Sequence, residues 1–251
     1  MNPDIAFVML AHARSGSESL LATLNLHEDI CAVSEPFNPN YKTWDVDNHD
    51  YRSKITDVRS LYEQLEVVSR KFNGIKTTDE DLPRELNDVL VGDARFKLIF
   101  LRRSNLLQAV VSQAIADRTG LWQKWDAVGR IAGRYGSLGE LDVHQLGDRL
   151  AQLDDDINHY GNLVESQRRE SSVMLTYEDL YFAPRDTRTD VVNRLLRFLD
   201  CSPLAPDQVD RYMAPKNGQL NSQELYRLIT NCDTIEARLG SDRTGWLFAP
   251  H

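Results

Sequence analysis

The stretch Ala11-His12-Ala13-Arg14-Ser15-Gly16-Ser17-Glu18-Ser19 decides the fold expected for this chain. An unbroken apolar run, 5–10, precedes it, and a helical pattern that begins with Leu20-Leu21 follows it. A strand, a short turn of small residues and a helix together present backbone N–H groups and the positive end of a helix dipole to a phosphate. Arg14 adds a cation at the mouth of the turn. The sequence therefore predicts a loop that binds a nucleotide phosphate.

The rest of the chain alternates apolar runs with amphipathic patterns. Further strands are predicted at 30–33, 74–78, 95–101 and 172–177. Helices are predicted over 56–72, after Pro83, from Leu106 to Gly120, over 143–166, and over 187–200, 206–213 and 222–239. This alternation is typical of an α/β fold with a central, mainly parallel sheet flanked by helices. With no internal repeat or linker, residues 1–251 are expected to form a single domain.

Composition narrows the function classes. The chain of 251 residues carries a formal net charge of −9, whereas a general nucleic-acid binder is expected to be basic. The apolar run near the N-terminus is too short for a signal sequence or a membrane span, so a cytoplasmic protein is expected. Cys31, Cys201 and Cys232 contain no C-x-x-C pair, which predicts reduced, mostly buried thiols and no metal site.

A second anion-binding position is predicted after the strand at 95–101. That strand ends in Arg102-Arg103, and the helix that follows carries Ser112. The first loop is not a Walker A motif, because no Gly-Lys pair is present and the cation Arg14 precedes Gly16. Two anion positions on one sheet without a Walker lysine favour a phosphorylated ligand other than a simple triphosphate.

These residues resemble the sulfotransferases that use 3′-phosphoadenosine 5′-phosphosulfate (PAPS). Arg14-Ser15-Gly16-Ser17 with Leu20-Leu21 is similar to the 5′-phosphosulfate loop of that family, and Lys97–Arg103 with Ser112 is similar to its 3′-phosphate site. Further landmarks resemble the bacterial carbohydrate, trehalose-type branch: Phe72–Lys76, Ala116–Trp122, Tyr177–Leu180 with Pro184, and the closing segment Asn231–Trp246. The resemblance runs from Phe7 to Phe248 and implies a three-layer fold like that of the P-loop nucleoside triphosphate hydrolases.

The resemblance also implies an activity. A sulfuryl group would pass in line from PAPS to a hydroxyl or amine of a small-molecule or carbohydrate acceptor, leaving adenosine 3′,5′-bisphosphate. The donor-binding residues implied are Arg14, Ser15, Gly16, Ser17, Glu18, Ser19, Arg103 and Ser112. Arg14 would also act in catalysis, by neutralising charge on the leaving phosphate. Residues 119–170 are expected to form a helical substrate or lid region, in which the helix at 143–166 is either a lid or the surface of a homodimer.

Two residues are candidates for the base that accepts the proton of the acceptor. Glu35 follows the second apolar run and is held at the strand end by Pro36 and Pro39; the alternative role is an ion pair or helix cap. His12 is the second candidate, with a structural buried imidazole as its alternative. Lys76 is expected either to orient the sulfate or substrate, or to be exposed.

Two features leave other interpretations open. Glu18 stands where relatives have a hydroxyl, and its carboxylate would repel the donor unless it faces away or is paired. Arg103 and Ser112 are nine positions apart, where eight is usual, so Arg102 and Arg103 share the role or the helix begins one residue later. A kinase-like P-loop phosphotransferase and a non-catalytic nucleotide-binding protein are the alternative functions.

Several aromatic residues are expected to line an acceptor cleft or form local cores: Trp44, Tyr51, Trp122, Trp125 and Tyr135.

Overall fold

The computed structural model describes residues 6–38, 51–122, 133–134, 136–167, 171–214 and 222–248. Its centre is a five-stranded sheet in the order β2-β3-β1-β4-β5, and every neighbouring pair of strands is parallel. The strands are β1 (Phe7–Ala11), β2 (Ala32–Ser34), β3 (Gly74–Thr78), β4 (Lys97–Arg102) and β5 (Ser172–Thr176). The predicted α/β fold with a parallel sheet is confirmed.

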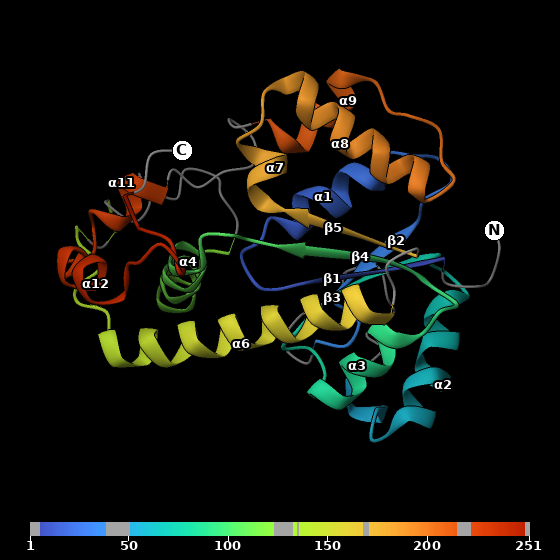
Figure 1. Ribbon diagram of the computed structural model, residues 1–251, viewed down its shortest axis with the longest axis horizontal. Coiled ribbons are helices and arrows are strands. Elements are labelled where there is room, and N and C mark those ends of the chain that lie inside the picture. The colour runs from blue at the N-terminus through green and yellow to red at the C-terminus, as the bar shows by residue number, and fades with distance from the viewer. Residues whose placement is uncertain are drawn as a thin grey trace.

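Helices cover both faces of this sheet (Figure 1). One face carries α1 (Ser17–Leu24), α7 (Tyr177–Tyr181), α8 (Arg185–Phe198) and α9 (Pro206–Met213). The other face carries α2 (Val58–Ser69), α3 (Arg84–Gly92) and α6 (Val143–Gln167), and a short 3₁₀ helix spans Arg52–Lys54. All five residues of β1 are buried, and successive side chains of the strand enter opposite cores. This two-sided burial explains why β1 is a continuous apolar run rather than an alternating one.

A third group of helices lies beyond the carboxyl ends of the strands (Figure 1). It comprises α4 (Leu106–Thr119), α11 (Ser222–Tyr226) and α12 (Cys232–Leu239), and it shares a core with Leu146 and Leu150 of α6. The α4 helix ends at Gly120, which adopts the left-handed conformation with φ 68°, as the sequence predicts.

The single helix predicted over 222–239 is wrong, because the chain turns between α11 and α12. At this turn Ile229 pairs with Gly139, and the Asn231 side chain bonds both backbone groups of Leu141. The backbone bonds of this bridge, from Leu138 N–H to Leu228 O and from Thr230 N–H to Gly139 O, satisfy groups that a continuous helix would have bonded internally. An asparagine amide that can replace main-chain partners in this way favours turns over helix interiors.

The topology places a crevice at the carboxyl ends of the central strands. The chain goes from β1 to β2 and β3 on one side of the sheet, then crosses β1 to reach β4 on the other side. Ligands of open α/β sheets bind where the strand order reverses in this way. The loops after β1, β2, β3 and β4 therefore meet at the expected site.

Two further observations concern the described residues. None of the helices there is both long and apolar enough to cross a membrane. All three cysteines are free, but Cys31 is exposed and Cys201 and Cys232 are partly exposed, so the expectation of mostly buried thiols is wrong.

Candidate functional site

The loop between β1 and α1 has a conformation that its sequence requires. Gly16 adopts φ 80°, and a Cβ atom there would lie 2.4 Å from Cε2 of Tyr181. The Tyr181 hydroxyl donates to the Gly16 carbonyl at 2.6 Å, so the ring closes over the loop. Arg14 also has a positive φ, 65°, which is uncommon for a residue with a side chain. The loop is thus held in a strained form that opens the N-terminus of α1, with Ser17, Glu18 and Ser19 in its first turn.

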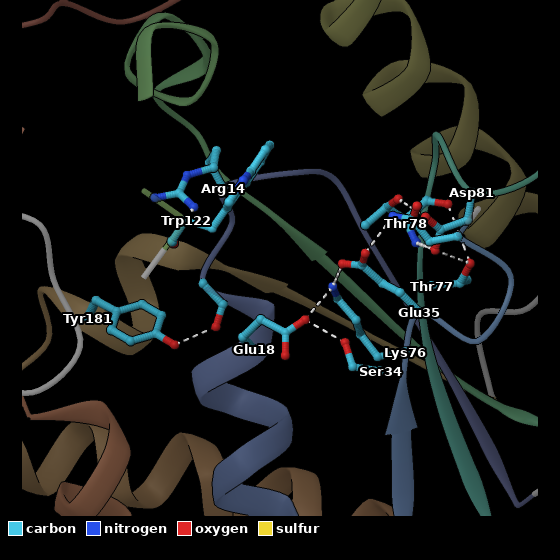
Figure 2. Close-up of polar contacts among 12 residues, drawn as sticks. Arg14, Glu18, Ser34, Glu35, Lys76, Thr77, Thr78, Asp81, Trp122 and Tyr181 are labelled. Carbon is cyan, nitrogen blue, oxygen red and sulfur yellow. Dashed lines mark hydrogen bonds and ion pairs between the residues drawn. The ribbon is translucent and has the colours of Figure 1, made fainter. Parts of the chain in front are cut away.

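Arg14 joins this loop to α4. Its Nε donates to Oγ of Ser112 at 3.0 Å, and its Nη1 donates to the carbonyl of Trp122 at 3.1 Å, near the end of α4. Figure 2 shows the guanidinium lying beside Trp122, above the loop. The structure therefore brings Arg14 and Ser112, two residues predicted for different phosphate groups, into direct contact.

Arg103 supplies a second guanidinium at the end of β4. Its side chain is 4% exposed, lies over the ring of Tyr177 at 4.5 Å and donates to Oε1 of Gln108. Burial and the charge of Arg103 lower the pKa of Arg14, which indicates that the two cations act on each other through a poorly solvated space. Neither cation has a carboxylate partner among the described residues. An anion between them would relieve this repulsion.

Several buried polar atoms around these two arginines lack hydrogen-bond partners among the described residues. They are Oγ of Ser15, Nε of Arg103 and Nδ1 of His12. Buried donors are rarely left unpaired in folded proteins, because each costs about 1–3 kcal/mol. Ser15 of the loop and Arg103 after β4 thus present a hydroxyl and an N–H group that a hydrogen-bond acceptor such as a phosphate oxygen would satisfy.

His12 lies under the loop as a neutral imidazole. Its ring is 2% exposed, and its Nε2 accepts the backbone N–H of Arg103 at 3.2 Å, which places the ring proton on Nδ1. Burial, followed by the charges of Arg103 and Arg102, lowers the pKa of His12 to about 3. The nitrogen that would accept a proton is therefore engaged in holding the backbone after β4.

A second cluster, of opposite sign, lies across the crevice from Arg14 (Figure 2). Lys76 of β3 is 2% exposed and its ammonium donates to Glu18 at 2.9 Å and to Glu35. Ser34 donates its hydroxyl to the same oxygen of Glu18. Burial alone would lower the pKa of Lys76, but the carboxylates of Glu18 and Glu35 outweigh it and the pKa is raised. Glu18 is thus paired, and Lys76 is buried rather than exposed.

Glu35 follows β2 in a strained backbone conformation, with φ 46°. Its backbone N–H donates to the Lys76 carbonyl at 2.6 Å, and the Asn38 amide donates to its carboxylate at 2.7 Å. Only three non-glycine residues with positive φ occur among the described residues, and Glu35 and Arg14 are two of them. Such strain persists where surrounding contacts impose it, and it is frequent at functional sites.

Asp81 closes the acidic side of the crevice after β3. It is 2% exposed and accepts from the Thr77 hydroxyl at 3.0 Å and from the backbone and hydroxyl of Thr78 at 2.8 and 2.7 Å. Burial, followed by the charge of Glu35, raises the pKa of Asp81 to about 6. Its three donors identify it as the residue that fixes the turn after β3.

The predicted site residues therefore form two neighbouring groups at one sheet edge. Arg14, Ser15, Arg103 and Ser112 gather with His12 on one side, and Glu18 and Glu35 meet through Lys76 on the other. Of the aromatic candidates, Tyr51 is 4% exposed inside a core, as a local core predicts, and Trp122 is 51% exposed. Trp44, Trp125 and Tyr135 lie outside the described residues, as do 123–132 and 168–170 of the predicted lid region.

Three residues at the site escape prediction from sequence. Tyr181 closes the loop, Glu178 accepts the backbone N–H groups of Ser104 and Asn105, and Gln108 holds Arg103. Gln108 had a recognisable signal, because it is a lone amide in the apolar run 106–111. Among the described residues, no three side chains of His, Cys, Asp or Glu are grouped so that they could hold a metal ion.

Sequence comparisons identify no relative of this chain: no family model and no curated protein matches it. Among solved structures, the chain is similar to a sulfotransferase domain from the curacin biosynthetic pathway. The two share 14% sequence identity with a TM-score of 0.49, over 93% of this chain and 97% of the other. At this identity the chemistry has to be derived from the site's own residues.

Proposed function

We propose that the chain is a PAPS-dependent sulfotransferase. The observation that carries the proposal is the pair of guanidiniums, Arg14 and Arg103, that share a poorly solvated space without a carboxylate partner among the described residues. The unpaired donors on Ser15 and Arg103 fit the same kind of ligand, a phosphate-bearing one. No Walker lysine accompanies the loop, which argues against a triphosphate.

Each group has a role in this proposal. The donor, when bound, supplies an activated sulfuryl group and a phosphate that leaves with negative charge. Arg14 and the backbone N–H groups at the start of α1 hold and neutralise that phosphate. Arg103 and Ser112 hold the 3′-phosphate. Since the Ser112 oxygen accepts the proton of Arg14, its own hydroxyl proton can be donated to a ligand.

Glu35 is the proposed base. Its carboxylate lies at the carboxyl end of β2, within the crevice, where it accepts from Lys76 and Asn38. A carboxylate oxygen has lone pairs for a further proton, which the acceptor hydroxyl would supply. His12 remains the alternative, but its Nε2 is occupied and burial lowers its pKa to about 3, so it is a weak acceptor near neutral pH.

A cavity between α4 and α6 is the proposed place for the acceptor. It has a volume of about 310 Å³, at the lower end of the usual range for small-molecule sites, and its lining includes Asp117, Gln145 and Arg149. These side chains provide both donors and acceptors of hydrogen bonds, which suits a sulfuryl-accepting molecule with several hydroxyls. The charge of Asp117 raises the pKa of Arg14, against burial and Arg103, which supports a position for the acceptor near the anion site. Arg149→Gln is expected to raise the KM for the acceptor and leave bisphosphate affinity unchanged; a loss of bisphosphate affinity would contradict this placement.

A ligand-dependent melting experiment tests the donor. At a concentration 100 times its Kd, adenosine 3′,5′-bisphosphate should add about 2.7 kcal/mol to the free energy of unfolding. For a chain of this size that corresponds to a rise in Tm of roughly 5–10 °C. Stabilisation by ATP with Mg²⁺ but not by the bisphosphate would instead support a kinase-like phosphotransferase. A protein that binds the bisphosphate but transfers no sulfuryl group to any acceptor in a broad panel would be a non-catalytic nucleotide-binding protein.

Glu35→Gln tests the base. The amide retains the shape of the side chain but cannot take up a proton, so transfer should fall by a factor of about 10²–10⁴. Bisphosphate affinity should stay within about twofold, because Glu35 does not contact the proposed anion site. Unchanged turnover would remove Glu35 from the mechanism.

A further inference from the structure

Gln108 connects the anion site to the last described segment of the chain. This buried amide, 1% exposed, donates through Nε2 to the carbonyls of Trp246 at 3.2 Å and Leu247 at 3.0 Å. Its Oε1 accepts from Nη2 of Arg103. Because only the NH₂ group can donate to two carbonyls, the amide has one possible orientation, with its oxygen directed at Arg103.

The segment Thr244–Leu247 is itself held in place by several contacts. Thr244 accepts the backbone N–H of Leu107 at 2.9 Å, and the Asn105 amide donates to Trp246 at 2.8 Å. At Gly245, with φ 84°, a Cβ atom would lie 2.4 Å from Oδ1 of Asn105. The segment is therefore seated closely on the first turn of α4. It gives Gln108 a fixed pair of carbonyl partners.

The orientation of the Arg103 guanidinium depends on Gln108, since no carboxylate among the described residues pairs with it. A neutral amide oxygen fixes the direction of the guanidinium without cancelling its charge, whereas a carboxylate would fix it and neutralise it. The Tyr177 ring packs against the guanidinium, with its centroid 4.5 Å from Cζ of Arg103. Nε of Arg103 has no hydrogen-bond partner among the described residues and can donate to a ligand. Gln108 is thus suited to presenting a fully charged, preoriented guanidinium to an anion.

We infer that Gln108 is a positioning residue for the anion site: it aligns Arg103 and transmits the placement of Thr244–Leu247 to it. This inference rests on the proposed binding of a phosphorylated ligand by Arg103. It goes beyond that proposal by giving a role in the ligand's affinity to a residue, and to a segment, that do not contact the ligand.

Two substitutions test the inference by calorimetric titration well below the melting temperature. Gln108→Glu keeps an acceptor for Arg103 but neutralises its charge, and Gln108→Met removes the acceptor. Both should raise the Kd for adenosine 3′,5′-bisphosphate by about tenfold or more, with the larger effect for Gln108→Glu. Asn193→Asp is the matched control, because the Asn193 amide, in α8, likewise bonds both backbone groups of a distant residue, Leu204. It should lower stability and leave the Kd unchanged.

A double-mutant cycle separates positioning from general support. In an Arg103→Gln background, Gln108→Glu should have almost no further effect on the Kd, since the group that it aligns is gone. Full additivity of the two substitutions, or an unchanged Kd in Gln108→Glu, would overturn the inference and leave the donor assignment intact.

Inorganic pyrophosphate serves as a second probe. If the wild type binds pyrophosphate but not the bisphosphate, the proposed donor is wrong, and the same cycle measured with pyrophosphate still decides the role of Gln108. If the wild type binds neither compound, the donor proposal and the inference both fail.

Discussion

Replacing His12 with glutamine should make the protein less sensitive to acid. The pKa of His12 is about 3 in the folded protein, through burial and the charges of Arg103 and Arg102, against 6.5 for an ordinary histidine. Because folding lowers the pKa of His12, the stability that the neutral ring contributes to the fold is complete above pH 6.5 and is lost as the pH falls toward 3. The unfolded chain takes up a proton in this interval that the folded chain excludes.

The size of the effect follows from the two pKa values. Between pH 7 and pH 5, this one group should remove about 2 kcal/mol from the free energy of unfolding. Glutamine does not titrate, and its carbonyl can still accept the backbone N–H of Arg103. The wild type should therefore lose about 2 kcal/mol more than His12→Gln over this interval, because all other titrating groups are common to both proteins.

Urea unfolding followed by circular dichroism at pH 7 and pH 5 measures this difference, provided that the m-values agree. His144→Gln is the matched control, since His144 is exposed in the first turn of α6, and it should follow the wild type. Parallel losses in wild type and His12→Gln would refute the assignment of a neutral, buried His12. The variant also bears on catalysis: if it binds the bisphosphate but transfers no sulfuryl group, His12 rather than Glu35 is the base.

Three other changes have expected outcomes. Gly16→Ala should destabilise the protein by roughly 2–5 kcal/mol in urea unfolding, because φ at Gly16 is 80° and a Cβ atom would lie too close to Tyr181. Gly161→Ala is the control: this glycine lies in open space within α6, and the substitution should stabilise the protein by roughly 0.5–1 kcal/mol. Equal effects of the two substitutions would contradict the geometry of the loop. Asp81→Asn should lower the free energy of unfolding less at pH 8 than at pH 4. Because the pKa of Asp81 is raised to about 6, the wild-type carboxyl stabilises the fold most below its ordinary pKa near 3.8, and about 3 kcal/mol of this stabilisation is lost as the pH rises through 6. A constant difference between the two proteins across this range would refute that pKa. Lys76→Met should cost about 3–5 kcal/mol by leaving Glu18 and Glu35 without their cation, and a cost below 1 kcal/mol would show that the cluster is dispensable.

The sequence predicts the centre of the sheet well because β1 and β4 are buried on both faces. The central strands β1 and β4 become near-continuous apolar runs, and β3, although it carries Lys76, begins and ends at the predicted residues Gly74 and Thr78. Prediction fails between α11 and α12 because the sequence pattern reports only on neighbouring residues. The pattern of apolar residues continues through the turn, and the bonds that break the helix come from Gly139 and Leu141, which are distant in sequence.

The site is predictable to a different degree on its two sides. Arg14 and Arg103 could be predicted because strand ends position cations at one sheet edge. The pairing of Glu18 with Lys76 could not, since it depends on side chains from α1 and β3 that only the folded sheet brings together. The role of Gln108 likewise depends on carbonyls from the far end of the described chain. Periodicity carries information about neighbours in sequence, and these contacts are between residues that are not neighbours.

The all-parallel sheet also governs when the site can appear during folding. Every strand pairing joins segments far apart in sequence, and non-local pairings of this kind form slowly. The crevice needs β1, β2, β3 and β4 to be aligned, so a folding transition state with an incomplete sheet would have no ligand site. A bound nucleotide should then slow unfolding and leave the folding rate nearly unchanged. Resistance to unfolding, rather than speed of folding, is the property that a ligand of this protein would alter.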